Sequence, residues 1–235
     1  MDSYCLNSPS CGKGWGEVLY LASAYLAPVQ YYTKLLHYPK IVIDRHEHYV
    51  KQSYRNRCNI AAANGIQALS IPTDKGSELK CAVKDMRIAP HADWQKNHWK
   101  SIEAAYNSTP FFEYYKDDFI PFYEKKWDFL FDFNTELQAV ILNLLDINPN
   151  IEFSSEYETT FGISQKTPAG IDLREEIHPK KKSADTNFSP LPYYQVFDEK
   201  FGFIPNLSII DLLFNMGNEA LLVLYKSYCI FKKKL

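Results

Sequence analysis

The sequence predicts an α/β fold, in which a small, mostly parallel sheet with an N-terminal βαβ unit is followed by a largely helical C-terminal half. Two observations predict it. Before residue 93, short apolar runs of strand length alternate with segments of helical spacing. After it, bulky residues recur three and four positions apart over longer stretches. A chain of 235 residues is long enough to bury a sizeable core.

The expected domain organisation follows from the same patterns. Residues 1–14 are rich in Ser, Gly and Cys and predict a flexible N-terminal arm. Residues 15–235 are expected to form one domain, with an α/β part over 15–92 and a mainly helical part over 93–235.

The βαβ unit is predicted from three consecutive segments. Val18–Leu26 is apolar and short enough for a buried strand, Gln30–Leu36 has helical spacing and ends near Pro39, and Lys40–Asp44 reads as the next strand. This order is typical of two parallel strands joined by a helix. Asn64-Gly65 then predicts a turn before a strand over 66–72, and Val83–Ala89 is expected to add another.

Helical signals dominate from Asp93. Asn97 or Ser101 can cap a helix that ends at Tyr106, and Pro110 suits the first turn of the next helix. Asn134 is expected to cap the clearest helix, whose apolar face carries Leu137, Val140, Ile141, Leu144 and Leu145.

The remaining chain predicts one strand, one long loop and two helices. Residues 151–157 alternate as a strand, and the polar stretch Thr159–Pro192 is expected to be a loop that could serve as a lid. Ser208 and Asp211 have the spacing of a helix cap. Gly217 should end that helix, before a last one from Glu219.

Composition excludes several classes of function. The formal net charge of −2 argues against a nucleic-acid-binding surface. Five cysteines without a CxxC pair favour free thiols in a cytoplasmic protein. No stretch approaches the roughly 18 apolar residues of a membrane span. Ala22-Ser23-Ala24 looks like a signal cleavage site, but Glu17 directly precedes the apolar run, which we interpret as a strand.

The densest polar run follows the strand that ends at Asp44. Ligands of parallel α/β sheets bind beyond the carboxyl ends of the strands, so Asp44 is placed to act as a general base, a sugar-hydroxyl acceptor or a metal ligand. Its structural alternative is a helix cap or an ion pair with Arg45 or Arg57. His46 is a candidate general base. With His48 it could bind metal, but no third ligand stands at a typical spacing, and we expect no metal.

A basic and aromatic cluster comes next, and it is a candidate substrate-binding segment. Arginine forks match phosphate oxygens, and tyrosines can stack on a base or sugar. The alternative is a solvated charged face. The candidate residues are Lys51, Tyr54, Arg55, Asn56 and Arg57.

The helical half adds further candidates. His98 can act as a general base if it faces the cleft. Asp211 and Asn215 lie one helical turn apart and can both reach a site, although Asp211 can equally be a cap. We expect one cleft between Asp44, the 54–57 segment and the helix of His98, in a polar pocket that is also lined by Tyr25 and Tyr106.

These residues carry a resemblance to the WbqC-like protein family of bacteria. The order and spacing of several short motifs are similar to those of the family, and Gln30 lies within the first of them. They are Tyr25-Leu26-Ala27-Pro28-Val29-Gln30-Tyr31-Tyr32, Asp44–Tyr49 with Tyr54-Arg55-Asn56-Arg57, Asn64-Gly65 with Leu69–Pro72, Trp94 to Phe112, Asp172-Leu173-Arg174, and Leu207–Asn215.

The resemblance implies a cytoplasmic role in making surface polysaccharide or related amino sugars. From it and the candidate residues we expect acyl or aminoacyl transfer to the amino group of a nucleotide-linked sugar, with an acyl donor or carrier protein as partner and no cofactor. Two alternatives stay open: a non-catalytic interaction protein of glycan assembly, and a nucleotidyl-transfer enzyme in which Asp44 holds Mg²⁺. The sequence names neither the sugar nor the acyl donor.

Overall fold

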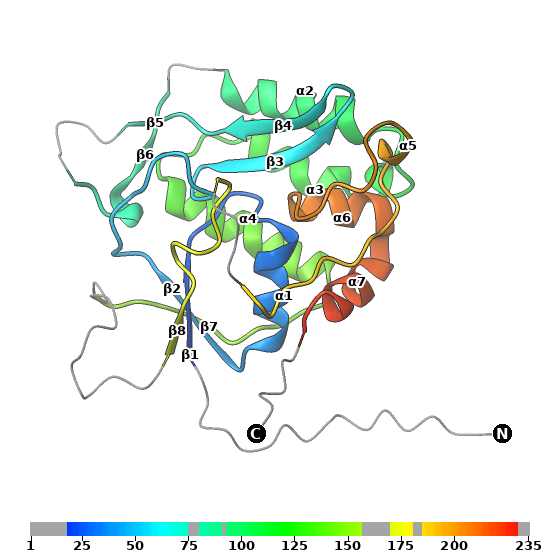
Figure 1. Ribbon diagram of the computed structural model, residues 1–235. Helices are drawn as coiled ribbons and strands as arrows, with labels where there is room; N and C mark the ends of the chain where they lie inside the picture. Colours follow the sequence, from blue (N-terminus) through cyan, green and yellow to red (C-terminus); the bar gives the residue numbers. More distant parts are fainter. Residues whose placement is uncertain (1–17, 75–79, 91–92, 157–169, 181–184, 230–235) are drawn as a thin grey trace, which may run out of the picture.

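A computed structural model describes residues 18–74, 80–90, 93–156, 170–180 and 185–229. The expected N-terminal arm, including Cys5 and Cys11, lies outside these residues. A four-stranded parallel sheet stands at one end of the molecule (Figure 1), in the order β7-β2-β1-β8. Its strands are β7 (Ile151–Phe153), β2 (Lys40–Asp44), β1 (Val18–Ala22) and β8 (Gly170–Asp172). This sheet and the helices of the second half confirm the predicted α/β class.

The N-terminal βαβ unit is confirmed. Helix α1 (Val29–His37) joins β1 to β2, and these strands pair in parallel from Val18 opposite Lys40 to Ala22 opposite Asp44. Strand β1 is shorter than expected because the chain turns after Ala22, and Leu26 adopts a positive φ of 41° on the way into α1.

The strand order creates a topological switch point. From β1 the chain adds β2 and then β7 on one side, whereas β8 pairs with the opposite edge of β1. The crevice between β1 and β8 is therefore where a parallel sheet of this kind binds ligands. A side chain at position 170 would clash with the Val18 carbonyl, 2.7 Å from its Cβ, so Gly170 permits this pairing.

Strand β8 corrects the expected long loop over Thr159–Pro192. A strand of three residues, flanked by polar chain, gives no periodic signal that distinguishes it from a loop. Within that stretch, residues 159–169 and 181–184 lie outside the described residues, and the expected lid role falls on them. Two of the four sheet strands, β7 and β8, come from the predicted helical part.

Two antiparallel pairs lie above the parallel sheet in Figure 1. Asn64-Gly65 forms the predicted turn, with Gly65 at φ 103°, and joins β3 (Arg57–Ala62) to β4 (Gly65–Ser70). Strand β3 was not predicted, since the polar residues Arg57 and Asn59 at its start are untypical of a strand. The strand expected over Val83–Ala89 forms only in part: a 3₁₀ turn (η1, Val83–Asp85) takes its first half, and the strand is limited to β6 (Arg87–Ile88), which pairs with β5 (Thr73–Asp74).

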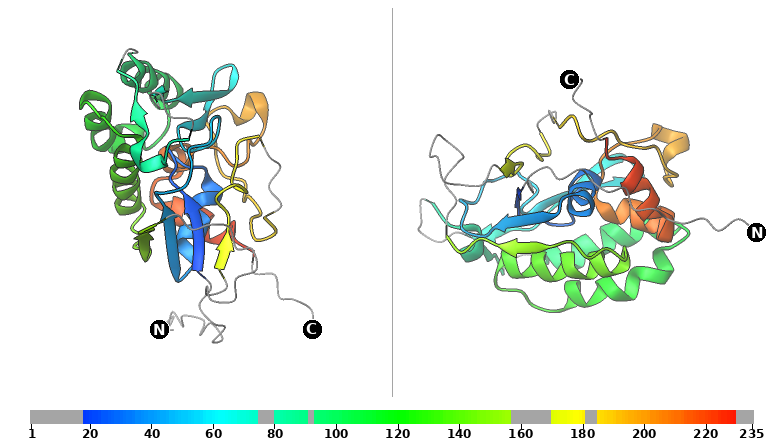
Figure 2. Two further views of the ribbon diagram at one scale, coloured as in Figure 1. Left: turned by 90° about the vertical axis from the view of Figure 1, so that its left-hand side faces the viewer. Right: turned by 90° about the horizontal axis from the view of Figure 1, so that it is seen from below.

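Three long helices pack together on one side of the molecule (Figure 2). They are α2 (Trp94–Tyr106), α3 (Phe112–Glu124) and α4 (Leu130–Leu144). Three expected helix starts are wrong. Helix α2 begins before Asn97, Pro110 precedes the N-cap of α3, and Asn134 lies inside α4, where its amide donates to Ser23 and to the Arg55 carbonyl.

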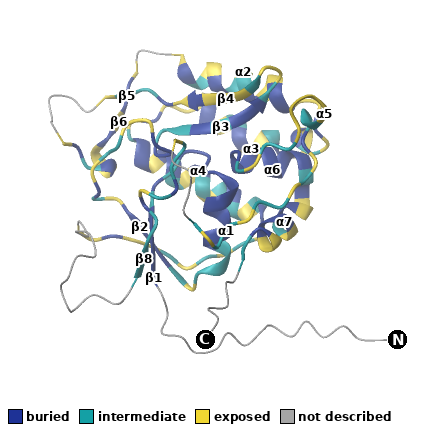
Figure 3. Ribbon diagram, viewed as in Figure 1, coloured by how far each residue is buried: buried dark blue, intermediate teal, exposed yellow. Residues whose placement is uncertain are grey.

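The C-terminal segment returns to α1. It contains α5 (Asp198–Phe201), α6 (Ile209–Met216), η2 (Gly217–Glu219) and α7 (Ala220–Lys226). Gly217 ends α6 as predicted, at φ 53°. Ser208 is the N-cap residue of α6, as predicted, but its side chain makes no capping bond, since the hydroxyl donates to the Leu26 carbonyl, 2.8 Å away. Helices α6 and α7 both contact α1, and the buried sheet, α1 and α6 form one continuous core (Figure 3).

Candidate functional site

Six charged side chains gather at the carboxyl ends of β1, β2 and β8, and we call them the strand-end cluster. Four are carboxylates and two are guanidinium groups: Asp44, Glu47, Asp172, Glu175, Arg55 and Arg174. The cluster lies where the strand order reverses, at the position expected for ligands in such a sheet.

Four hydrogen-bond donors bind the Asp44 carboxylate. Its carboxylate accepts hydrogen bonds from the backbone N–H groups of His46 and Glu47, at 2.9 and 3.1 Å, and from the Ser154 hydroxyl at 2.8 Å. The fourth donor is the Arg174 guanidinium. Asp44 is fully buried, and its ionic partner is therefore Arg174 rather than Arg45 or Arg57.

Arg55 is clamped by two acids. Its Nε and Nη2 donate to the two carboxylate oxygens of Glu47, at 2.8 and 2.5 Å, and Nη2 also donates to Glu175, 2.8 Å away. Arg55 is 2% exposed. Burial raises the pKa of Glu47 to about 7, although the bonds from Arg55 act in the opposite direction.

Arg174 links two strands of the sheet. It donates through Nε and Nη2 to Asp172 at the end of β8, and through Nη1 to Asp44 at the end of β2. Burial alone would raise the pKa of Asp172, but the bonds from Arg174 outweigh it and lower that pKa. The guanidinium is thus fixed in position before any ligand arrives.

A small cavity lies directly beside the strand-end cluster. Its volume is about 10 Å³, close to the least that holds one water molecule. Polar side chains lining it come from the turn after β1, from α1, and from the chain around Arg55 and Arg174: Ser23, Tyr31, Tyr54, Arg55 and Arg174. Within the described part of the chain, no hydrogen bond engages Nη1 of Arg55.

His98 lies in a second, separate network. The Tyr25 hydroxyl is 3.0 Å from His98 Nδ1 and 3.0 Å from the Tyr123 hydroxyl, and a backbone hydrogen bond ties His98 to Ser70. We call Tyr25, His98 and Tyr123 the tyrosine–histidine network. Burial lowers the pKa of His98 to about 4, so the ring is neutral at pH 7. Neither Tyr25 nor His98 lines the cavity.

Asp211 is the centre of a third network. It accepts hydrogen bonds from the hydroxyls of Tyr106 and Tyr193, at 3.0 and 2.7 Å, and from the Gln195 amide at 2.9 Å. The Asn215 amide donates to its backbone carbonyl. Burial raises the pKa of Asp211 to about 6 against these three bonds. These contacts join the 193–195 segment to α2 and α6.

The other predicted residues are dispersed. Gln30 donates to Asp185 on the far side of α1, and Asn56 donates to the Ile71 carbonyl. Arg57 bonds Ser70 on the β-hairpin, and Lys51 is exposed. None of these four lines the cavity. Arg55 and Arg57 are therefore not a joint phosphate grip at the cavity.

His46 and His48 do not share a strand face. Strand β2 ends at Asp44, so the alternation that would point both rings one way does not extend to them. His46 is half-buried and His48 is exposed. In the described ranges, no group of three or more His, Cys, Asp or Glu side chains is arranged to hold a metal ion.

Sequence reasoning gave no role to Glu47, Asp172, Arg174, Glu175 or Ser23 in the cluster and its cavity. Asp172 and Arg174 entered only through the resemblance. In the sequence, Asp172 and Arg174 follow a short apolar segment, as Asp44 does at the end of β2. Strand β8 is, however, too short to be recognised as a strand from periodicity.

The fold and site define an α/β protein with an ionic cluster and a small cavity at the switch point of a parallel sheet. The profile of the WbqC-like protein family matches residues 23–223, and the chain belongs to that family. It is also similar to an uncharacterized protein of Mycobacterium tuberculosis, Rv1507c, with 26% identity over 224 residues, which cover 87% of this chain and 95% of the relative. No solved structure matches it. None of the helices in the described residues is long and apolar enough to span a membrane.

Proposed function

We propose that the chain is a cytoplasmic enzyme of surface-polysaccharide or amino-sugar biosynthesis, which transfers an acyl or aminoacyl group to the amino group of a nucleotide-linked sugar. The cavity at the switch point carries this proposal. It has room for about one oxygen atom, and Arg55, Arg174 and Ser23 are among the residues that line it. Donors fixed around a site of this size suit the acyl carbonyl oxygen, whose negative charge develops in the transition state.

The charge of the strand-end cluster favours an acyl oxygen over a phosphate group. Its four carboxylates outnumber its two guanidinium groups, which leaves a formal charge of −2 when all are ionised. A phosphate dianion would meet this excess, whereas a carbonyl oxygen is neutral in the ground state. The carboxylates also hold Arg55 and Arg174 in place, so that the donors need no rearrangement during the reaction.

The sugar would approach from the exposed side of the cluster. The side chains of Glu175 and Asp172 are 49% and 27% exposed, and both can accept from the sugar's ammonium group. In the proposed step a base first takes one proton from the ammonium group, and the resulting neutral amine attacks the acyl carbon. The bond to the donor's leaving group then breaks, and the leaving group takes the second proton, which the amine loses on acylation. His46, half-buried beside Asp44, is the proposed base.

The nucleotide phosphates would lie farther out. The Lys180 ammonium donates to the side chain of Gln52, the neighbour of Lys51 in the sequence. Lys180 is also close to the cavity along the chain, because Ile177, three residues before it, lines the cavity. We propose that Lys51 and Lys180 bind the diphosphate. His98 has no chemical role in this proposal because it is neutral and enclosed. A nucleotidyl-transfer mechanism is less well supported, since a Mg²⁺ on Asp44 would have to displace existing donors.

A thermal-shift panel with the full chain tests the proposal. It compares UDP-glucosamine, its N-acetylated form, UDP alone, ATP with Mg²⁺, and acetyl-coenzyme A. We expect the free-amine sugar nucleotide to raise the melting temperature more than its N-acetylated form, and Glu175→Gln to remove that difference. Arg57→Ala, outside the cavity, is the matched control. A shift with Mg²⁺-ATP alone would support nucleotidyl transfer, and no shift with any ligand would support an interaction protein.

A further inference from the structure

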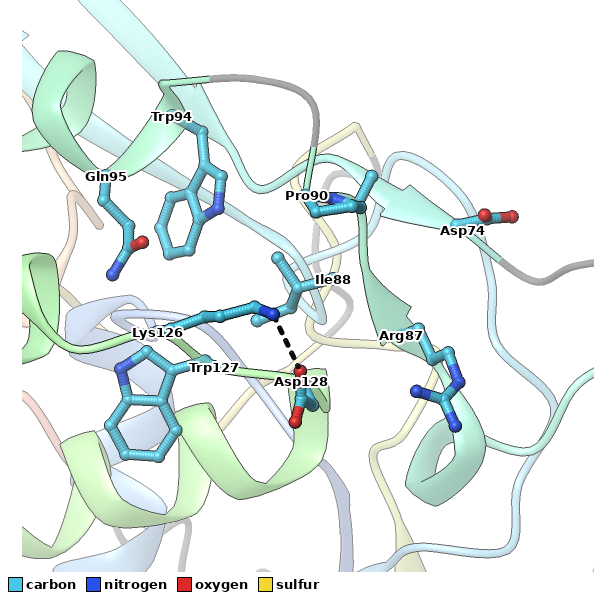
Figure 4. Close-up of a pocket in the computed structure, with 10 residues that line it drawn as sticks. Asp74, Arg87, Ile88, Pro90, Trp94, Gln95, Lys126, Trp127 and Asp128 are labelled. Atoms are coloured by element: carbon cyan, nitrogen blue, oxygen red, sulfur yellow. Dashed lines mark ion pairs between the residues drawn. The ribbon is translucent and has the colours of Figure 1, made fainter.

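A larger pocket lies away from the strand-end cluster, between β6, the start of α2 and the chain over 126–128 (Figure 4). Its volume is about 370 Å³, at the lower end of the range for small-molecule sites, and enough for a single ring-sized ligand. It shares no lining residue with the switch-point cavity. Its chemistry is therefore independent of the proposed function.

Trp94 supplies an unused hydrogen-bond donor to this pocket. The side chain is 6% exposed, with its ring packed against His98 and Phe133. No acceptor among the described residues engages its indole N–H, which faces Ile88 and Pro90 across the pocket in Figure 4. Trp127 differs, because its N–H donates to the Phe122 carbonyl at 3.1 Å. Trp94 is a buried residue, but its indole nitrogen is not among the described side-chain atoms that are both buried and unpartnered, so this N–H reaches the pocket and can donate to a ligand.

Gln95 supplies the matching acceptor. Its amide nitrogen donates to the carbonyls of Phe122 and Lys125, at 3.0 and 2.6 Å, and these two bonds fix the orientation of the amide. Its oxygen accepts no hydrogen bond within the described part of the chain and points toward Trp94 in Figure 4. The pocket wall therefore carries a donor on the side of the Trp94 ring that faces Ile88, and a fixed acceptor on the side of that ring that faces Gln95 (Figure 4).

The other lining residues decide between charged and neutral ligands. Two cationic side chains, Arg87 and Lys126, are balanced by two carboxylates, Asp74 and Asp128, and Lys126 lies 3.9 Å from Asp128. Among the lining residues that the structure describes, these formal charges cancel and leave no excess to attract an anion. Its floor is apolar, formed by Ile88, Ala89 and Pro90.

We propose that this pocket binds one neutral sugar ring. A sugar ring carries several hydroxyls that both accept and donate, so one hydroxyl can accept from the Trp94 indole and another can donate to the Gln95 oxygen. The carbon face of the ring would lie on the apolar floor, and the balanced charges at the rim would bind further hydroxyls. The pocket is a second glycan contact, separate from the site of chemistry.

NMR of the tryptophan indole N–H groups tests this proposal on the full chain. The sequence has four tryptophans, and Trp94→Phe assigns the Trp94 signal by its loss. Methyl α-D-mannoside, methyl β-D-glucoside and N-acetylglucosamine are titrated in turn, with inorganic phosphate as the anionic probe. We expect at least one glycoside to shift the Trp94 signal in a saturable way, and phosphate to leave it unchanged.

Matched variants make the test specific. Trp94→Phe keeps a ring but loses the donor, and should weaken glycoside affinity by about threefold to tenfold, the range for one net hydrogen bond. Trp99→Phe is the control, because Trp99 stacks on Phe112 outside the pocket and should leave affinity unchanged. A Trp94 signal that no glycoside moves would overturn the proposal, and so would one that responds to phosphate instead. Should Trp94→Phe fail to fold, the titration of the natural chain still decides.

Discussion

The strand-end cluster and the tyrosine–histidine network are both buried, and they handle polarity in opposite ways. The cluster holds its charged groups in pairs, Arg174 with Asp44 and Arg55 with Glu47, although burial raises the pKa of Glu47 to about 7. The network keeps its members neutral, and His98 has a pKa of about 4 because it is desolvated without an acidic partner. Of the two groups, as far as the described residues show, only the cluster lines the switch-point cavity. The difference teaches that a buried group with a charged partner keeps its charge, whereas a buried group without one is held neutral.

The largest expected effect is the loss of a buried ionic partner from the cluster. Arg174→Ala would leave Asp44 charged, fully buried and without its cation. Breaking one side of a buried pair costs about 3–5 kcal/mol, so we expect the free energy of unfolding to fall by that amount. Urea denaturation at pH 7 measures it.

Arg57→Ala is the control for that prediction. Arg57 is half-exposed, with its Nε bonded to the Ser70 hydroxyl. Its removal should cost about 1 kcal/mol or less, as for one ordinary hydrogen bond. Equal losses in the two variants would contradict the view that the cluster is held together by buried charge pairs.

The tyrosine–histidine network should instead respond to pH. The pKa of His98 is about 4 in the folded chain, below the usual 6.5, so the unfolded chain binds more protons between these values. The stability that neutral His98 contributes is complete above pH 6.5 and is lost as the pH falls through 4. The loss amounts to about 3 kcal/mol.

His98→Gln removes this titration. Unfolding by urea at several pH values from 4 to 7 should show the natural chain losing about 3 kcal/mol relative to the variant as the pH falls. If the difference between the two proteins stays constant over that range, His98 is not held neutral by burial, and the contrast between the two regions fails.

Much of the fold was predictable, and particular elements show where prediction ends. The run Lys40–Asp44 is apolar, β-branched and bounded by Pro39, so its local pattern matches the observed strand. Strand β8 forms because Gly170 fits against Val18, a contact that periodicity does not encode. Asn134 looked like a cap because asparagine favours caps, yet its long-range bonds to Ser23 and the Arg55 carbonyl decide its place.

The candidate site was likewise predictable only where it depends on local sequence and not on long-range contacts. Asp44 and Arg55 belong to one motif at a strand end, where topology alone points to a ligand. Arg174, the ionic partner of Asp44, is 130 residues from it along the chain, and only the pairing of β8 with β1 brings it there. His98 was grouped with them because a sequence does not show which histidine faces solvent.

Asp211 gives an effect of similar size and opposite sign and sharpens the comparison, because it is a buried acid held by neutral donors. Burial raises its pKa to about 6 from the usual 3.8, so the folded chain binds more protons between these values. Protonated Asp211 contributes up to about 3 kcal/mol of stability, which is present below pH 3.8 and is lost as the pH rises through 6. Relative to Asp211→Asn, the natural chain should weaken from pH 4 to 6.5 in urea unfolding. A relative gain over that range would rule out this account of Asp211.

The most direct measurement compares function after one hydroxyl is removed from each region. Ser23→Ala alters the cavity wall, and Tyr123→Phe removes a hydrogen bond to Tyr25 in the tyrosine–histidine network. Each should cost about 1 kcal/mol of stability. Both are expressed in a strain that lacks the chain, with surface polysaccharide stained and protein levels matched by immunoblot. We expect Ser23→Ala to lose at least tenfold in polysaccharide and Tyr123→Phe to keep the natural level. The reverse pattern would place the chemistry at the tyrosine–histidine network and contradict the assignment of the switch-point cavity.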